Sequence, residues 1–229
     1  MEYQIEGTVF PMLQVRLTRG ESVFTESGGM AWMSEGIKMS TSTRGGLMAG
    51  LGRALAGESL FMVTYACEVP SGSVVFTPEA PGRILDLVLS EGQSLICQKD
   101  TFLCAEQSVD IKIHFHKRLG AGMFGGEGFI LQNITGPGRV FLAIPGEVHE
   151  RTLASGEKLL IDPGHIAMFE PSVNYDISMV RGIKNVLFAG EGLFLATLTG
   201  PGKVWMETMP ISNLAAKIAR YIPSKGMGS

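Results

Sequence analysis

The sequence has few charged residues and no cluster of positive charge. Only 18% of its 229 residues are charged, and the formal net charge is −3. Low charge together with 45% hydrophobic residues excludes an intrinsically disordered chain. Because proteins that bind nucleic acid through its phosphates carry basic patches, we expect no nucleic-acid partner.

Long apolar runs and paired cysteines are also missing. No stretch reaches the roughly 18 apolar residues that a membrane-spanning helix needs, and the first ten residues contain no basic segment followed by an apolar one. We therefore expect no secretory signal and a cytoplasmic location. Cys67, Cys97 and Cys104 include no C-x-x-C pair, so we expect them to be reduced, buried and without a redox role.

Glycine is abundant, with 30 residues, and it marks a pattern that recurs three times. A glycine followed by two polar and two apolar residues stands at Gly20, Gly92 and Gly156. A second glycine-led element begins at Gly57, Gly126 and Gly190, and in the last two copies it follows the first by 34 residues. The pattern predicts a single domain over residues 1–222 with three internal repeats, at about 10–80, 82–145 and 146–210.

The local pattern within each repeat is typical of β-strands. Residues 84–89 and 109–115 alternate apolar and polar side chains, and Gly-Pro-Gly turns follow similar runs at 136–138 and 200–202. We predict an all-β fold of three related β-sandwich units. A pseudo-three-fold arrangement would let each unit cover an open edge of the next, and a linear stack is the alternative.

A helix is predicted at the end of the chain, over residues 212–222. Ser212 is a suitable N-cap, Pro223 a stop, and Leu214 and Ile218 belong to an apolar stripe. We expect this helix to cover a sheet, with a role at a membrane surface or a partner as the alternative. Residues 223–229 are expected to be a loose tail.

The repeated glycine-led elements, the Gly-Pro-Gly turns and the stretch DPGHIAMFEPSV at 162–173 resemble the mitochondrial-biogenesis family. This family is also called the altered-inheritance-of-mitochondria family, and the resemblance covers about residues 3–222. It implies three units in one chain, each with a fold similar to that of the tryptophan RNA-binding attenuator protein. It implies no known reaction, and the net charge argues against carrying over the attenuator protein's RNA binding.

Three histidines suggest an alternative, a metal-dependent cupin-like enzyme. His114 and His116 would share one face of a strand, and His149 would supply a third imidazole. Three imidazoles with one open position suit catalytic zinc, iron or manganese. The carboxylate that the cupin motif places after its second histidine is absent here. Our first expectation is therefore no metal site, no cofactor and no catalytic residue.

Apolar residues in three loops between the repeated elements are candidates for an interface. These residues are Leu47, Met48, Leu51, Met123, Phe124, Ile183 and Val186. They would form an apolar end of the body or plug its core. The glycine-rich loops contain no G-K-[ST], which argues against nucleotide binding. We predict a non-catalytic structural or binding scaffold for an unknown protein or small ligand. A homo-oligomer and contact with a membrane surface remain open, the latter not expected.

Overall fold

The computed structural model describes residues 1–26, 28–43, 61–117, 128–179, 194–219 and 221–222, and these are mostly β-strands. The first group of strands comprises β1 (Glu2–Glu6), β2 (Met12–Thr18), β3 (Ser22–Glu26), β4 (Met30–Met33), β5 (Ile37–Thr43), β6 (Phe61–Cys67) and β7 (Ser71–Phe76). The second comprises β8 (Gly82–Leu89), β9 (Ser94–Gln98), the short helix η1 (Lys99–Thr101), β10 (Phe102–Glu106), β11 (Asp110–Lys117), β12 (Phe129–Thr135) and β13 (Gly138–Pro145). The third comprises β14 (Val148–Leu153), β15 (Lys158–Ile161), the short helix η2 (Pro163–His165), β16 (Ile166–Phe169), β17 (Asn174–Met179), β18 (Phe194–Thr199) and β19 (Gly202–Glu207).

The same pairing pattern occurs in each group of strands. In residues 12–76, which we call unit 1, one sheet has the order β2-β7-β4 and the facing sheet the order β5-β6-β3. Unit 2 (residues 82–145) repeats this as β8-β13-β10 and β11-β12-β9, and unit 3 (148–207) as β14-β19-β16 and β17-β18-β15. The all-β class predicted from the alternating sequence is confirmed.

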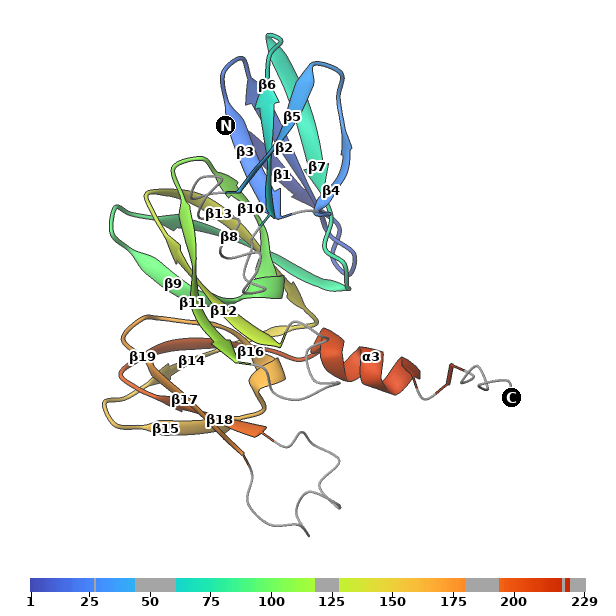
Figure 1. Ribbon diagram of the computed structural model, residues 1–229. Coiled ribbons are helices and arrows are strands. Elements are labelled where there is room, and N and C mark those ends of the chain that lie inside the picture. Colours follow the sequence, from blue (N-terminus) through green and yellow to red (C-terminus); the bar gives the residue numbers. More distant parts are fainter. Residues whose placement is uncertain (27, 44–60, 118–127, 180–193, 220, 223–229) are drawn as a thin grey trace.

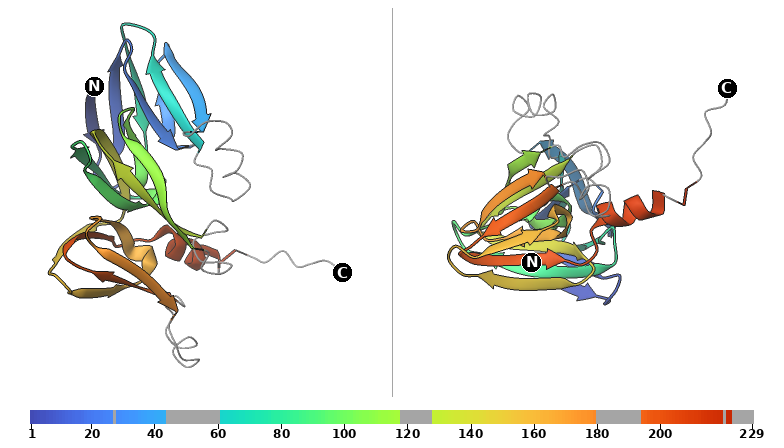
Figure 2. Two further views of the ribbon diagram at one scale, coloured as in Figure 1. Left: turned by 60° about the vertical axis from the view of Figure 1, so that its left-hand side comes forward. Right: turned by 90° about the horizontal axis from the view of Figure 1, so that it is seen from below.

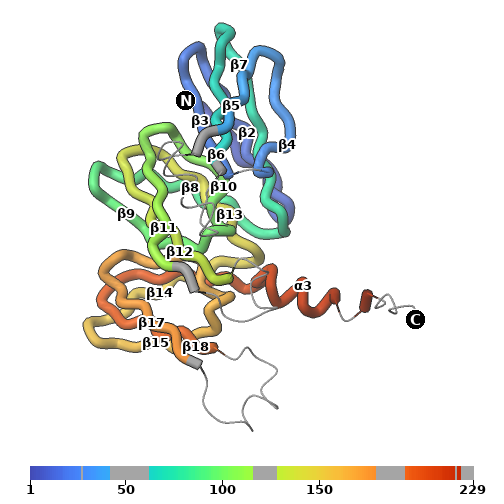
Figure 3. The backbone as a smooth tube through the Cα atoms, in the orientation of Figure 1, coloured from blue at the N-terminus to red at the C-terminus, as the bar shows by residue number. Residues whose placement is uncertain are grey.

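Two sheets continue from one unit into the next. β3 of unit 1 pairs with β10 of unit 2, and β9 of unit 2 pairs with β16 of unit 3, both antiparallel. Each junction produces a six-stranded sheet, whereas β4 and β15 stand at sheet edges at the two ends of the molecule. The units are stacked in a row (Figure 1), and the chain passes from one unit to the next in sequence order (Figure 3).

The pseudo-three-fold arrangement is therefore wrong, and the linear stack is the arrangement observed. A closed arrangement would need the free edge strand of unit 3 to reach that of unit 1. In the described part of the chain, β4 pairs only with β7 and β15 only with β18. The physical reason is that edge pairing joins neighbouring units only, so each unit covers one edge of the next and both ends stay open.

A side chain at the end of one strand holds a hairpin in each unit. Glu106 Oε2 accepts a hydrogen bond from the Arg139 backbone N–H at 2.8 Å. Glu170 Oε2 accepts one from the Lys203 backbone N–H at 2.9 Å. In unit 1, Ser34 is at the same position, and its Oγ accepts a hydrogen bond from the Ser73 backbone N–H at 2.8 Å. These carboxylates act on the backbone at the start of β13 and β19, so they position the hairpins structurally.

The hydrophobic core consists of three buried clusters, each of which contains residues from more than one unit. One buried cluster contains Phe24 of unit 1, Phe102 of unit 2 and Met168 of unit 3, all at most 7% exposed. Burial of apolar surface at about 25 cal/mol per Å² makes such continuity a major source of stability. The three cysteines are free and buried in this core, as expected.

The C-terminal helix α3 (Ile211–Ala219) forms where the apolar spacing predicts a helix, but it does not cover a sheet. Its N–H groups at Asn213 and Leu214 bond to the Pro210 carbonyl, so the helix begins one residue before Ser212, which lies inside the first turn. None of its residues is buried, and it leaves the body to one side (Figure 2). The expected packing on a sheet is wrong because the apolar stripe finds no facing sheet. No helix in the described ranges is both long and apolar enough to cross a membrane.

Candidate binding groove

The structure does not bring the three candidate metal ligands together. His114 lies on β11 and His149 on β14, the two opposite edge strands of one six-stranded sheet, with four strands between them. At about 4.8 Å between strands, the path across the sheet is about 24 Å. A bulge at His114 also interrupts the regular pairing before His116. Among the described residues no cluster of three His, Cys, Asp or Glu fits a metal. The three-histidine site is therefore wrong.

The candidate interface residues in the three loops lie outside the residues that the structure describes. They are Leu47, Met48, Leu51, Met123, Phe124, Ile183 and Val186. Their role as interface or core plug stays a prediction.

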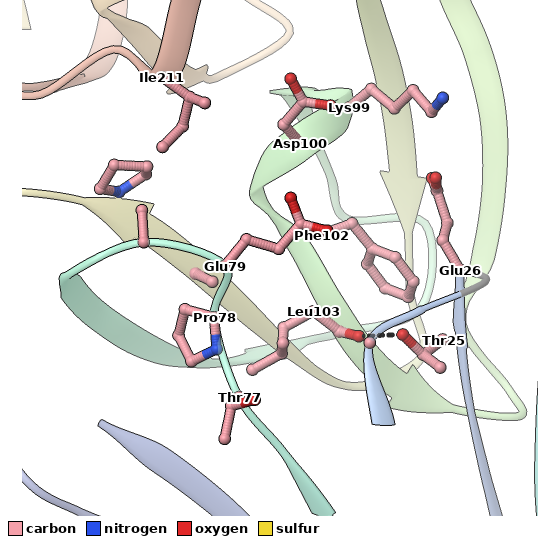
Figure 4. Close-up of a pocket in the computed structure, with 14 residues that line it drawn as sticks. Thr25, Glu26, Thr77, Pro78, Glu79, Lys99, Asp100, Phe102, Leu103 and Ile211 are labelled. Atoms are coloured by element: carbon pink, nitrogen blue, oxygen red, sulfur yellow. Dashed lines mark hydrogen bonds between the residues drawn. The ribbon is translucent and has the colours of Figure 1, made fainter. Parts of the chain in front are cut away.

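A cavity of about 150 Å³ lies at the junction of units 1 and 2. Segments far apart in the sequence line it: the end of β3, the linker after β7, η1 with the start of β10, and the first residue of α3 (Figure 4). Glu26, Glu79 and Asp100 supply carboxylates and Lys99 a single ammonium, while Phe102 adds part of the apolar wall. A volume of this size accommodates a group as large as benzene.

Hydrogen bonds fix the wall of this first cavity. The Thr25 hydroxyl on β3 donates to the Leu103 carbonyl on β10, which ties unit 1 to unit 2 beside the cavity (Figure 4). Gln132 on β12 is fully buried, and its Nε2 donates to Glu26 Oε1 at 2.6 Å. The Glu26 carboxylate is thus oriented by a side chain from unit 2, although it belongs to unit 1.

A second cavity, of about 280 Å³, lies at the junction of units 2 and 3. Gln98 and Thr101 at η1, Gly164 at η2 and Glu207 at the end of β19 contribute to it, together with the first turn of α3. The two cavities share Asp100, Pro145 and Ile211. The loops after β3, β9 and β15 thus produce a cavity at each junction along one side of the stack. We call the two cavities together the junction groove.

Glu207 is the most unusual titratable group of the groove. Its side chain is only 5% exposed. Burial, with a smaller contribution from the charge of Asp100, raises the pKa of Glu207 to about 8. In the same cavity, Gln98 Oε1 is buried without a hydrogen-bond partner among the described residues. At neutral pH the Glu207 carboxyl therefore mostly keeps its proton.

The apolar face of α3 continues the groove outward. Ile211 lines both cavities, and Leu214 and Ile218 follow it at helical spacing. These three side chains are 37%, 38% and 51% exposed. Tyr221 and Ile222, just beyond the helix, are 81% and 63% exposed. Groove and helix together make one surface with acidic and apolar character.

Sequence reasoning missed the groove. Its polar residues come from several short segments that lie far apart in the sequence, so they form no motif with a fixed spacing. The one available signal was Glu207, a carboxylate that follows the apolar run Val204, Trp205 and Met206. A charged residue at that position predicts burial of an ionisable group.

Comparison with known proteins decides the family. The model of the family described as "Mitochondrial biogenesis AIM24" matches residues 3–209. The chain belongs to this family. An uncharacterized protein of Streptococcus pyogenes serotype M6 is 28% identical over 98% of this chain and 92% of its own length. Altered inheritance of mitochondria protein 24 of Verticillium alfalfae is 19% identical over 96% of this chain and 56% of its own length.

A solved structure has the same overall fold. A crystal structure of a protein from Streptococcus pyogenes superposes with a TM-score of 0.78 at 25% identity, covering 96% of this chain and 99% of that one. The family resemblance noted from the repeated elements is thereby confirmed. The likeness of each unit to the tryptophan RNA-binding attenuator protein stays a prediction.

Proposed function

We propose that this member of the AIM24 family is a non-catalytic scaffold that binds a partner protein through the junction groove and the apolar face of α3. The observation that carries the proposal is the position of Ile211, which lines both cavities and begins the exposed apolar stripe of α3. Helices in proteins are stabilised mainly by packing of their apolar face against the rest of the molecule. No residue of α3 is buried, so α3 gains little stability in this way. Its apolar face is therefore available to another molecule.

The size of the cavities supports a protein partner. Drug-sized ligands occupy pockets of about 300–1,000 Å³, whereas these two measure about 150 and 280 Å³. Each volume suits a single large side chain. Protein interfaces obtain most of their binding energy from a few such side chains, chiefly Trp, Tyr and Arg, seated in pockets.

The charge of the groove supports a basic anchor on that partner. Glu26, Glu79 and Asp100 line the first cavity against the single cation of Lys99. An arginine side chain matches carboxylates in geometry and carries an apolar stem. The expected partner segment therefore presents an arginine next to aliphatic or aromatic residues.

Affinity capture from cells that naturally produce the protein tests this function. Three baits are compared: the wild type, a groove variant with Ile211→Arg and Leu214→Arg, and a matched control with Val88→Arg. Val88 is an apolar residue, 62% exposed, on the edge strand β8. We expect at least one protein to be recovered with the wild type and the control but to fall by about tenfold with the groove variant. Equal recovery with all three baits, each confirmed to be folded, would contradict the proposal.

A further inference from the structure

Both internal junctions bury the same positions of the paired strands. At the first junction Ala105 of β10 stands opposite Phe24 of β3, and both are fully buried. At the second junction Phe169 of β16 stands opposite Ile96 of β9, and these are 1% and 2% exposed. The chain thus makes the same kind of interface twice.

At the upper end of the stack, β4 holds the position that β10 and β16 hold at the junctions. Within their own units, β4 pairs with β7, β10 with β13 and β16 with β19. Each of β4, β10 and β16 carries a bulge at its second residue. This register aligns Trp32 with Cys104 and Met168, which are fully buried. On β4, however, Trp32 is 54% exposed and Met33, the counterpart of Ala105, is 37% exposed.

At the lower end, β15 holds the position of β3 and β9. The glycine-led elements align Leu160 with Phe24 and Ile96. Leu160 is 63% exposed, whereas its two counterparts are buried. Natural proteins protect edge strands against pairing with charge, bulges or a covering element. The bulge of β4 does not by itself prevent such pairing, because β10 and β16 carry the same bulge and pair at the internal junctions. Each end of this molecule thus exposes an edge strand with large apolar side chains.

If β4 of one copy paired with β15 of another in the register of the internal junctions, the facing residues would be complementary. Antiparallel pairing of β4 with β15 in this register places Met33 opposite Leu160 and Trp32 opposite Ile161. Two steps further along this register, Glu35, in the turn just after β4, would stand opposite Lys158 of β15, and both are exposed. The residues at the corresponding positions of the internal junctions, Gln107 with Ser22 and Pro171 with Ser94, carry no charge. Opposite charges across two strands favour their pairing.

We propose that copies of this chain associate head to tail, with β4 of one copy pairing with β15 of the next to form a third junction of the same kind. Such an interface joins two different surfaces, so each copy keeps one free end. The assembly grows beyond a dimer, into a ring where the rotation closes and a filament where it does not. The proposal is independent of the groove and of the partner proposed for it.

Mixing of two end-blocked variants tests the proposal. Trp32→Glu blocks the β4 end and Leu160→Glu the β15 end. Both side chains are exposed in the single chain, so neither change should unfold it. By light scattering after size exclusion, the wild type should be larger than a dimer. Each variant alone should run as the 24.6 kDa monomer. The equimolar mixture should form a dimer and stop there, because it contains one competent junction.

The control is Val88→Glu, which places the same charge on an exposed apolar residue away from both ends and should assemble like the wild type. Urea unfolding checks that all variants are folded. The proposal is overturned by a monomeric wild type, by assembly of either variant alone, or by a mixture that stays monomeric. It is also overturned if the mixture assembles beyond a dimer.

Discussion

Single residues in this protein show how position decides the role of a carboxylate. Glu106 and Glu170 lie at equivalent places and accept hydrogen bonds from backbone N–H groups, which holds a hairpin in each unit. Glu207 ends the strand that one of these hairpins begins, but it is buried, and burial raises the pKa of its carboxyl. The first two groups serve the fold. The third supplies a proton-carrying group to the groove.

Glu207 should make the stability of the protein fall as the pH rises. Its pKa is about 8 in the folded protein against an ordinary value of 4.5, so between these values the folded state binds a proton that the unfolded state has lost. The contribution is most favourable below about pH 4.5 and is lost as the pH rises to about 8. Glu207→Gln should remove this dependence and raise the free energy of unfolding at pH 9 by on the order of 2 kcal/mol.

Urea unfolding at pH 6 and pH 9 measures this effect. Glu91→Gln, a change at an exposed turn residue, is the control and should keep the pH dependence of the wild type. The same pH dependence in wild type and Glu207→Gln would show that the buried carboxyl does not titrate in this range.

The secondary-structure elements differ in how much of their stability comes from packing. The strands of the junctions are buried on both sides, whereas α3 has no buried residue and only its first turn lines the groove. The helix is therefore a surface element with a free apolar face. Its contribution to folding should be small although its sequence is strongly amphipathic.

Alanine substitution separates these two cases. The double change Leu214→Ala and Ile218→Ala should alter the free energy of unfolding by less than about 0.5 kcal/mol, because both side chains are exposed in the native protein. Leu198→Ala on β18, where the side chain is fully buried, should cost about 2–5 kcal/mol. Chemical denaturation of both variants provides the comparison. A large loss from the helix variant would mean that α3 packs on the body in solution.

Elements could be predicted from the sequence where periodicity is strong. The alternation over residues 84–89 and 109–115 corresponds to β8 and β11, and the apolar spacing after Pro210 corresponds to α3. The arrangement of the units could not be predicted from the sequence. A closed three-fold arrangement and a linear stack use the same strands and differ only in which edge strands pair. The junction groove could not be predicted from the sequence for a related reason. Asp100 and Glu207 meet only when two units are stacked.

On the scale of the whole molecule, the protein is a stack of three units with two internal junctions and two unused ends. The hydrophobic core passes through both junctions, and the cavities of the groove lie along one side of them. The partner binding proposed for the groove and the growth proposed at the ends of the stack would use different surfaces. If both proposals hold, one molecule could bind a partner while the stack extends.

Site-directed cross-linking tests the third junction most directly. Met33→Cys and Leu160→Cys place one thiol on each end at positions that the register sets opposite each other, close enough for a disulfide. The three native cysteines are buried. After mild oxidation, a mixture of the two variants should contain a covalent dimer with one copy of each, and neither variant alone should. Absence of that dimer from the mixture, or an equal yield from either variant alone, would contradict the head-to-tail stack.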